Sequence, residues 1–430
     1  MTTAVLDIND QSLLIMTDLE QSYSECGFAQ LSNKGITCGA DAYALHWQVP
    51  QSSFNDYWRH LNQLPLPHKQ QWARHNADIA FAQLQQMLLA AGSPERVILS
   101  VPGSFSDAQL ALLVGLLNAT SSALTGVIDS GLMAALMTKE DGWIVELHLH
   151  QTVLSLVHFE HSNGQTNLIV AQQEIIPDLG ILQIHNTVAN HISDRFIKDY
   201  RYDPLHDSAG EQAIYAQMAD WLSDIVIHNE TLIVLNTPSG DLSLTIHKDD
   251  IVVLLQRRLD HLTRVLSTQS ETNIAFTESA TLIPLLSSDY ADSDNIRRVD
   301  AAMVCLDIAE RVFSESAEPI RVSSLQISSL SAPERVLGRH SRNTIATHLL
   351  HEGEAWSLDA PVSISIRDGQ LRLSNDINKA AAVCLVIRDN SLRILHQQTG
   401  CRVVLPVKCS RGETLIVGEH SLMLIEVIHG

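Results

Sequence analysis

Residues Arg96–Thr120 read RVILSVPGSFSDAQLALLVGLLNAT, and the order of features in this stretch decides the fold. The run RVILSVP is rich in Val, Ile and Leu and ends in proline, which is typical of a buried β-strand. A turn with glycine and serine follows, and Asp107–Asn118 then predicts a helix. A strand, a short turn and a helix in succession are the building unit of α/β proteins.

Strand-like and helical runs alternate in the same way through about residue 316. The other strand-like runs are AVLDI, GWIVELHL, TVLSLVHF, NLIVAQQ, ETLIVLN and LSLTIH. Further helices are predicted over Ile79–Ala91, Gly210–Ile227, Lys248–Ser267 and Asp300–Phe313. In Lys248–Ser267 the apolar residues recur every three or four positions, which indicates a helix with one buried face. We therefore expect an α/β unit over residues 1–315.

A different pattern begins after a connector rich in serine, which we place at residues 316–344. Residues 345–430 contain short runs of Val, Ile and Leu separated by DG, DN, TG and RG turn signals. Spacing of this kind is typical of a small all-β sandwich. The sequence thus predicts two structural domains joined by a linker.

Composition argues against several classes of function. The 430 residues carry a net charge of −21, and so much negative charge repels nucleic acid and anionic lipid. The N-terminus lacks the features of a signal peptide. The sequence contains no apolar run of about 18 residues, so we expect no integral membrane segment. The six cysteines form no CxxC pair, which argues against a zinc or dithiol site. We expect a cytoplasmic protein that binds neither nucleic acid nor a membrane.

Arg96–Thr120 resembles the strand–turn–helix segment of the heat-shock chaperone ATPases, which reads Val-Pro-Ala-x-Phe-x-Asp-x-Gln. The matching residues are Val101, Pro102, Phe105, Asp107 and Gln109. Other segments resemble, in the family's order, the first phosphate loop, the connecting helix, the second phosphate loop, the adenosine loop and the last helix. The resemblance covers about residues 1–315 and implies a two-lobed α/β domain of the actin, sugar-kinase and heat-shock-chaperone ATPase type.

In this family two turns hold the phosphates of ATP, because glycine lets backbone N–H groups come close to them. The first turn reads Asp-x-Gly-Thr-Thr in the family and Asp7-Ile8-Asn9-Asp10-Gln11 here. Asp7 is kept, Asn9 replaces the glycine, and Asp10 brings a carboxylate to the place of the phosphates. Like charges repel, so this turn is expected to oppose nucleotide binding.

The second turn departs further from the family's Asp-x-Gly-Gly-Gly-Thr-x-Asp. Residues 146–153 read ELHLHQTV, so Glu146 replaces the first acid and His148 and His150 stand where glycines are lost. The three side chains alternate, and on one strand they would share a face, as plausible zinc ligands do. The simpler interpretation is that they fill the space of the nucleotide or lie at a hairpin tip. We expect no metal and no cofactor.

Further positions complete the predicted cleft. Glu278 and Ser279 replace the two glycines of the adenosine loop. Arg59 is a candidate counterpart of the family's lysine near the γ-phosphate, and Gly180 keeps one member of a glycine pair. Asp7 is left either as a general base or, more simply, as a hydrogen-bonding partner of a loop. Together the changes predict that ATP hydrolysis is lost, so we expect no catalytic residue.

Residues 345–430 resemble a forkhead-associated (FHA) domain, a β-sandwich that binds phosphothreonine peptides. The resemblance is carried by WSLDAPVSISIRDGQLRLSND at 356–376 and TGCRVVLPVKCSRGETLIVGEHSLMLIEV at 399–427. The family's phosphate-binding residues do not carry over. Ser365 falls on the arginine of a Gly-Arg pair, Arg367 lies two residues further on, and Asn378 and Lys379 fall in the Ser-x-x-His motif. Charge-assisted bonds to phosphate are thereby lost.

Both domains keep the pattern of a ligand-binding fold while their binding residues change. We therefore predict a catalytically silent pseudo-ATPase scaffold that mediates protein–protein interactions, and the acidic charge favours a basic protein partner. One alternative is a divergent nucleotide-binding, chaperone-like ATPase that uses side-chain donors such as Asn9, Gln11 and His148. A second alternative is a divergent phosphopeptide-binding adaptor in which the FHA-like domain is the working part.

Overall fold

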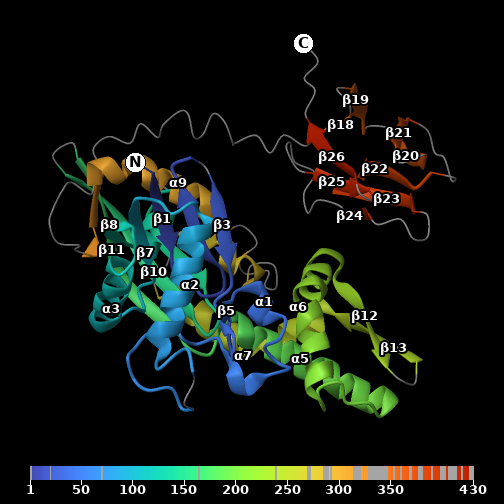
Figure 1. Ribbon diagram of the computed structural model, residues 1–430, viewed down its shortest axis with the longest axis horizontal. Coiled ribbons are helices and arrows are strands. Elements are labelled where there is room, and N and C mark those ends of the chain that lie inside the picture. The colour runs from blue at the N-terminus through green and yellow to red at the C-terminus, as the bar shows by residue number, and fades with distance from the viewer. Residues whose placement is uncertain are drawn as a thin grey trace. The chain divides into compact units, whose positions relative to one another are not determined.

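The computed structural model of the chain is mixed α/β and divides into two compact units, Met1–Ser329 and Leu330–Gly430 (Figure 1). Most of the expected connector, residues 316–344, lies outside the described residues, but residues 321–322 and 324–327 form strands of the N-terminal unit. The described residues are 2–19, 21–68, 71–138, 140–162, 165–237, 240–268, 273–283, 290, 293–312, 321–322, 324–327, 347–351, 354–358, 361–367, 370–375, 381–388, 391–397, 403–404, 414–417 and 420–425.

The first sheet of the N-terminal unit has the strand order β16-β8-β7-β1-β2-β3. β1, β2 and β3 are antiparallel neighbours, whereas β7, β8 and β16 continue the sheet in parallel with β1. The strands span Thr3–Asp7 (β1), Leu13–Thr17 (β2), Ser22–Glu25 (β3), Arg96–Val101 (β7), Ala123–Asp129 (β8) and Arg321–Val322 (β16). The turn between β1 and β2 is therefore residues 8–12, which the sequence places in the predicted cleft.

The second sheet repeats this arrangement in the order β15-β14-β9-β10-β11-β17. β9, β10 and β11 are antiparallel, and β14 and β15 run parallel to β9. The strands span Gly142–Leu147 (β9), Thr152–Ser162 (β10), Gln165–Ile176 (β11), Asn273–Thr277 (β14), Asp294–Ile296 (β15) and Ser324–Ile327 (β17). The turn between β9 and β10, residues 148–151, thus has the same topological position as residues 8–12 in the first sheet.

The predicted helices are present in the structure within a few residues of their expected bounds. The helices are Ala40–Tyr43 (α1), Asn76–Ala90 (α2), Asp107–Asn118 (α3), Ser130–Ala135 (α4), Ile181–Tyr200 (α5), Ser208–His228 (α6), Lys248–Leu266 (α7) and Arg298–Val312 (α9). α5 is a 20-residue helix that the sequence analysis does not predict. No described helix is long and apolar enough to cross a membrane.

Short elements complete the N-terminal unit. They are β4 (Ala29–Ser32), β5 (Gly35–Cys38), β6 (Ser53–Phe54), β12 (Glu230–Thr237), β13 (Gly240–His247) and the 3-10 turns η1 (Pro50–Ser52) and η2 (Glu278–Ala280). β4, β5 and β6 form a three-stranded sheet, and β12 and β13 form a hairpin.

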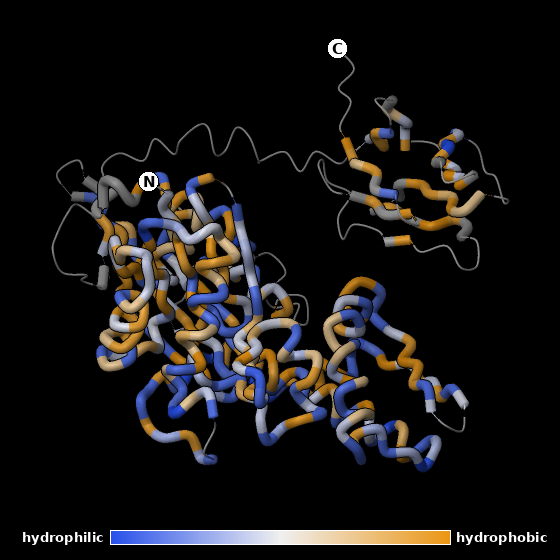
Figure 2. Tube along the Cα trace, in the orientation of Figure 1, coloured by the Kyte–Doolittle hydropathy of each residue, from blue (hydrophilic) through white to orange (hydrophobic). Residues whose placement is uncertain are grey.

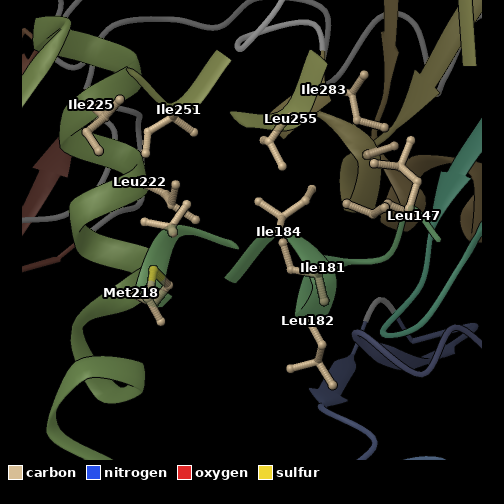
Figure 3. Packing of buried hydrophobic residues seen from close by; sticks show 14 of the residues in the cluster. Leu147, Ile181, Leu182, Ile184, Met218, Leu222, Ile225, Ile251, Leu255 and Ile283 are labelled. Carbon is tan, nitrogen blue, oxygen red and sulfur yellow. The ribbon is translucent and has the colours of Figure 1, made fainter. Parts of the chain in front are cut away.

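Two hydrophobic clusters lie within the core of the N-terminal unit, among the residues that the structure describes. One lies largely in residues 2–138, which we call the first half, and joins the first sheet to α2 and α3. The other lies largely in residues 140–312, the second half, where α5, α6 and α7 pack together. In Figure 3 Ile184, Leu222 and Leu255 of these helices point toward one another. Each half therefore has a core of its own, and the two turns lie between them.

The C-terminal unit consists of two antiparallel sheets in the orders β19-β18-β26-β25-β24 and β21-β20-β22-β23. Side chains from both sheets, among them Leu349, Leu424, Ile364 and Leu385, belong to one buried cluster. Apolar residues follow the strands in both units (Figure 2). The strands are His348–His351 (β18), Glu354–Ser357 (β19), Val362–Arg367 (β20), Gln370–Ser374 (β21), Val383–Arg388 (β22), Ser391–Gln397 (β23), Val403–Val404 (β24), Thr414–Val417 (β25) and His420–Ile425 (β26).

Candidate functional site

The two turns, residues 8–12 and 148–151, contact each other directly. Asn9 donates a hydrogen bond from Nδ2 to the carbonyl oxygen of Leu147 at 3.1 Å. The backbone N–H of Leu149 donates to Oδ1 of Asp10 at 2.8 Å. Asn9 and Asp10 are both buried. Side chains of the first turn are therefore bonded to the backbone of the second turn.

A third segment, η2 and the end of β14, joins this contact. Asn9 Nδ2 also donates to Oγ of Ser279 at 3.2 Å, and Ser279 Oγ lies 3.0 Å from Oγ1 of Thr277. The amide of Gln11, in the orientation that satisfies both of its ends, donates to the carbonyl oxygens of Leu147 and Ser279 at 2.9 and 3.1 Å. Residues of the turn 8–12, of the end of β9 with the turn 148–151, and of η2 thus form one network of hydrogen bonds.

Asp10 has a second partner in the turn 148–151, because Nδ1 of His148 lies 3.4 Å from the Oδ1 that Leu149 also contacts. Burial disfavours the charged carboxylate, but the hydrogen bond and charge of His148, the Leu149 N–H and the charge of His150 outweigh that cost. The pKa of Asp10 consequently lies below its usual value. Asp10 therefore carries its negative charge in the same space in which the resemblance places the phosphates.

Asp7 lies at the end of β1 and is almost fully buried. Its Oδ2 accepts from Nε of Arg298 at 2.8 Å and lies 2.6 Å from Nη2, and its Oδ1 accepts from Oγ of Ser100 at 2.8 Å. Arg298 also donates to the carbonyl oxygen of Ser12. Both oxygens of Asp7 are engaged, so the structure places this residue in a buried ion pair.

Glu146, near the end of β9, is equally buried but is bonded to a hydroxyl group. Oγ of Ser130, the first residue of α4, donates to its Oε2 at 2.7 Å. Burial and the neighbouring charges of Asp7 and Asp129 raise the pKa of Glu146 to about 7, although His148 and Ser130 act in the opposite direction. A neutral carboxyl group is therefore well populated at this position near pH 7.

Glu146 lies on β9, whereas His148 and His150 lie at the tip of the hairpin that follows, so the three side chains do not share one strand face. β9 ends at Leu147, so both histidines lie in the turn, and the three side chains contact different partners. Nε2 of His150 lies 3.0 Å from the carbonyl oxygen of Asn55. Within the described part of the chain, no three His, Cys, Asp or Glu side chains are grouped to hold a metal ion.

Gly180 lies directly behind the turn 148–151. A Cβ added to Gly180 would be 2.4 Å from the carbonyl carbon of His150, so glycine is required for this close approach. α5 begins at the next residue, and its first N–H groups, those of Ile181 and Leu182, donate to the carbonyl oxygens of His148 and Leu149. The N–H groups at the N-terminus of α5, where the helix dipole is positive, are thereby bonded to carbonyl groups of the protein.

The remaining predicted positions of the cleft are not part of this network. Glu278 is exposed, and its carbonyl oxygen accepts from Oγ1 of Thr281. The carbonyl oxygen of Arg59 accepts from Gln109 of α3, and Trp58 beside it is buried and donates to Gln83 of α2. These contacts tie residues 58 and 59 to the helices of the first half.

The predicted positions of the C-terminal unit are described only in part. Ser365 and Arg367 lie on β20, where Ser365 pairs with Arg372 of β21 and Arg367 pairs with Gln370. Ser365 is half-buried. Asn378 and Lys379 lie outside the described residues.

Several residues of the network are not predicted from the sequence. The most important are Arg298, Ser100, Ser130 and Asn55. One signal for Arg298 is present in the sequence, because two arginines open the last helix. A positive charge at the beginning of a helix opposes the helix dipole, so it calls for a separate cause such as a buried acid.

No protein-family model matches this chain, and no curated protein matches it. The chemistry of the site therefore follows from its geometry. The side chains of Asp7, Asn9 and Asp10 are bonded to other protein groups.

Proposed function

We propose that the chain is a catalytically silent pseudo-ATPase that serves as a scaffold for protein partners. In this proposal the N-terminal unit is a two-lobed domain of the actin and heat-shock-chaperone ATPase type, and the C-terminal unit is an FHA-like sandwich. Both large sheets contain three consecutive antiparallel strands, β1–β3 and β9–β11, of which the first is followed on its other side by parallel strands, and this shared arrangement supports the first assignment. The two packed antiparallel sheets support the second.

The proposal that the protein has no ATPase activity rests on one observation, the hydrogen bond from the Leu149 N–H to the carboxylate of Asp10. A phosphate group that enters between the turns needs backbone N–H donors of this kind. Here the donor is occupied by an internal anion, and a second anion at this place would meet the charge of Asp10 at short range. Asn9 and Gln11 in turn occupy the carbonyl oxygen of Leu147.

The same geometry argues against the chaperone-like ATPase alternative. That alternative requires Asn9, Gln11 and His148 to be free to bind nucleotide, whereas each is turned toward another protein group. It also requires Asp7 to act on water or magnesium, whereas Arg298 neutralises its charge.

A thermal-shift series with Mg-ATP and Mg-ADP tests the proposal on the full chain. A ligand present at 100 times its Kd would stabilise the protein by about 2.7 kcal/mol. We expect no shift with either nucleotide. A clear shift that is lost in the Asp7→Asn variant would contradict the proposal, and Asp107→Asn, on the outer helix α3, is the matched control.

The scaffold role is tested by affinity purification of the full chain from its native cells, followed by direct binding with the purified partner. We expect a protein partner whose binding is unaffected by Mg-ATP. Binding to a phosphothreonine peptide library that is lost in Arg367→Ala but kept in Arg372→Ala would instead favour the phosphopeptide adaptor.

A further inference from the structure

A short segment of the first half reaches the helices of the second half. This segment, residues 40–49, contains α1 and the turns after it, and we call it the strap. The indole ring of Trp47 stacks on the ring of Tyr215 of α6, with centroids 3.9 Å apart and planes inclined by 11°. The hydroxyl group of Tyr43 donates to the carbonyl oxygen of Tyr215 at 2.8 Å. Stacking and a hydrogen bond thus converge on one residue of α6.

A second residue of α6, Gln212, bonds the backbone of the strap twice. Its Oε1 accepts from the N–H of Trp47 at 3.1 Å, and its Nε2 donates to the carbonyl oxygen of Tyr43 at 3.3 Å. Gln212 is buried. Leaving a buried amide without partners is costly, so these two bonds fix where the strap lies on α6.

The hydrophobic cores divide at the same place. Ala29, Leu31 and Cys38 of β4 and β5 are buried in the cluster of the first half. Phe28 and Ala42, which flank them in sequence, are buried in the cluster of the second half. The rings of Phe28 and Tyr43 meet edge to face with centroids 4.9 Å apart. The strap therefore belongs to the first half by sequence, whereas its buried side chains are part of the core of the second half.

A polar chain connects the strap to the turn 148–151. Nδ2 of Asn55 lies 3.2 Å from Nε2 of His46 in the strap, and the carbonyl oxygen of Asn55 lies 3.0 Å from Nε2 of His150. Burial lowers the pKa of His46 to about 4, so His46 is neutral near pH 7 and can accept from the Asn55 amide. Movement of the strap would consequently disturb the turn.

We propose that the strap is a built-in latch that holds the two halves of the N-terminal unit together, and that its release exposes the turn 148–151. The proposal does not depend on whether the chain is a scaffold. It assigns the contact between the turns to two connected supports, the network around Asp10 and the strap on α6, which the chain His46–Asn55–His150 joins. A partner or condition that lifts Trp47 from Tyr215 would act on the turn without entering between the halves.

Hydrogen exchange of backbone amides in the full-length Trp47→Ala variant tests the latch. We expect exchange of the Leu149 N–H to rise about tenfold or more, because a stacked aromatic pair and its burial are lost. Exchange of the amides of β7, in the core of the first half, should change by less than twofold. Trp72→Ala is the matched control, since Trp72 is exposed and lies outside the strap.

Two outcomes would overturn the proposal. One is an equal increase at Leu149 and in β7, which would mean that Trp47 supports only overall stability. The other is unchanged exchange at Leu149. Tyr43→Phe keeps the ring and removes one hydrogen bond, so it provides the same comparison, with a smaller expected rise of about fivefold, if Trp47→Ala fails to fold.

Discussion

The turns 8–12 and 148–151 each connect the first two antiparallel strands of a large sheet, yet they contribute different groups to their contact. The first turn supplies side chains, those of Asn9, Asp10 and Gln11. The second supplies mainly backbone groups, the N–H of Leu149 and the neighbouring carbonyl oxygen of Leu147, together with the side chain of His148. A substitution in the first turn can therefore remove these bonds, whereas in the second turn only the contact of His148 depends on a side chain.

The buried acids next to the two turns, Asp7 and Glu146, also differ in their partners. Asp7 of the first sheet is paired with Arg298, whereas Glu146 of the second sheet accepts a hydrogen bond from the hydroxyl group of Ser130. Burial is nearly equal for the two acids. The hydroxyl group of Ser130 does not offset the cost of burial at Glu146, whose pKa is raised to about 7.

Arg298→Met should have the largest effect, because it leaves Asp7 charged and unpaired in the core. We expect a loss of about 3–5 kcal/mol in the free energy of unfolding, measured by urea denaturation at pH 7. The double variant Arg298→Met, Asp7→Asn should recover most of the loss. If the double variant is as unstable as the single one, packing rather than charge explains the effect.

Glu146→Gln should stabilise the protein at high pH and leave it unchanged at low pH. The pKa of Glu146 is raised from 4.5 to about 7 in the folded state, so the folded chain holds its proton more tightly than the unfolded chain. The stability from this proton is complete below pH 4.5 and is lost as pH rises through 7. At pH 9 the variant should gain on the order of 2–3 kcal/mol.

The measurement is a series of urea titrations between pH 4 and pH 9. Glu174→Gln is a suitable control, since Glu174 lies on β11 of the same sheet and is exposed. A gain that is the same at pH 4 and pH 9 would contradict the role of the proton.

Asp10→Ala tests the contact between the turns directly. It leaves the buried N–H of Leu149 without its acceptor, and we expect a loss of about 1–3 kcal/mol at pH 7. The pKa of Asp10 is lowered in the folded state, so its contribution is present above the usual pKa of 3.8 and is lost as pH falls below it. The difference between variant and wild type should therefore shrink in acid, and a constant difference would exclude the charge as its source.

Ser279→Ala should have the smallest effect, about 0.5–1 kcal/mol at pH 7. Asn9 then loses its bond to Ser279 but keeps the bond to Leu147. Asn9→Ala, which removes both bonds and also the bond that Asn9 Oδ1 accepts from the N–H of Gln11, should cost more in the same urea titration. Equal losses would mean that the bond to Leu147 contributes little.

Sequence patterns predict the helices and strands of this protein better than the hydrogen bonds and ion pairs between them. The helix α7 is predictable because its buried residues are all aliphatic, such as Leu255 and Leu259. α5 is missed because His185 and Ser193 interrupt its buried face. Ser193 lies there because its hydroxyl group bonds to Asp203, which no local pattern encodes.

The candidate site divides in the same way. The positions of both turns follow from the strand pattern and the resemblance, and the unusual residues Asn9 and His148 are visible in the sequence. Their partners are not, since Asp7 and Arg298 are 291 positions apart and meet only in the folded chain. Contacts of this kind depend on how the two sheets are placed, which no short stretch determines.

The last strands of the N-terminal unit matter for any attempt to shorten the protein. β16 pairs with β8 at the margin of the first sheet, and β17 pairs with β11 at the margin of the second, with a single residue between them in sequence. Ending the chain at residue 315 would uncover β8 and β11 at once, and unpaired strand edges promote aggregation. A fragment that extends to residue 329 retains both margins and is the better starting point for purification.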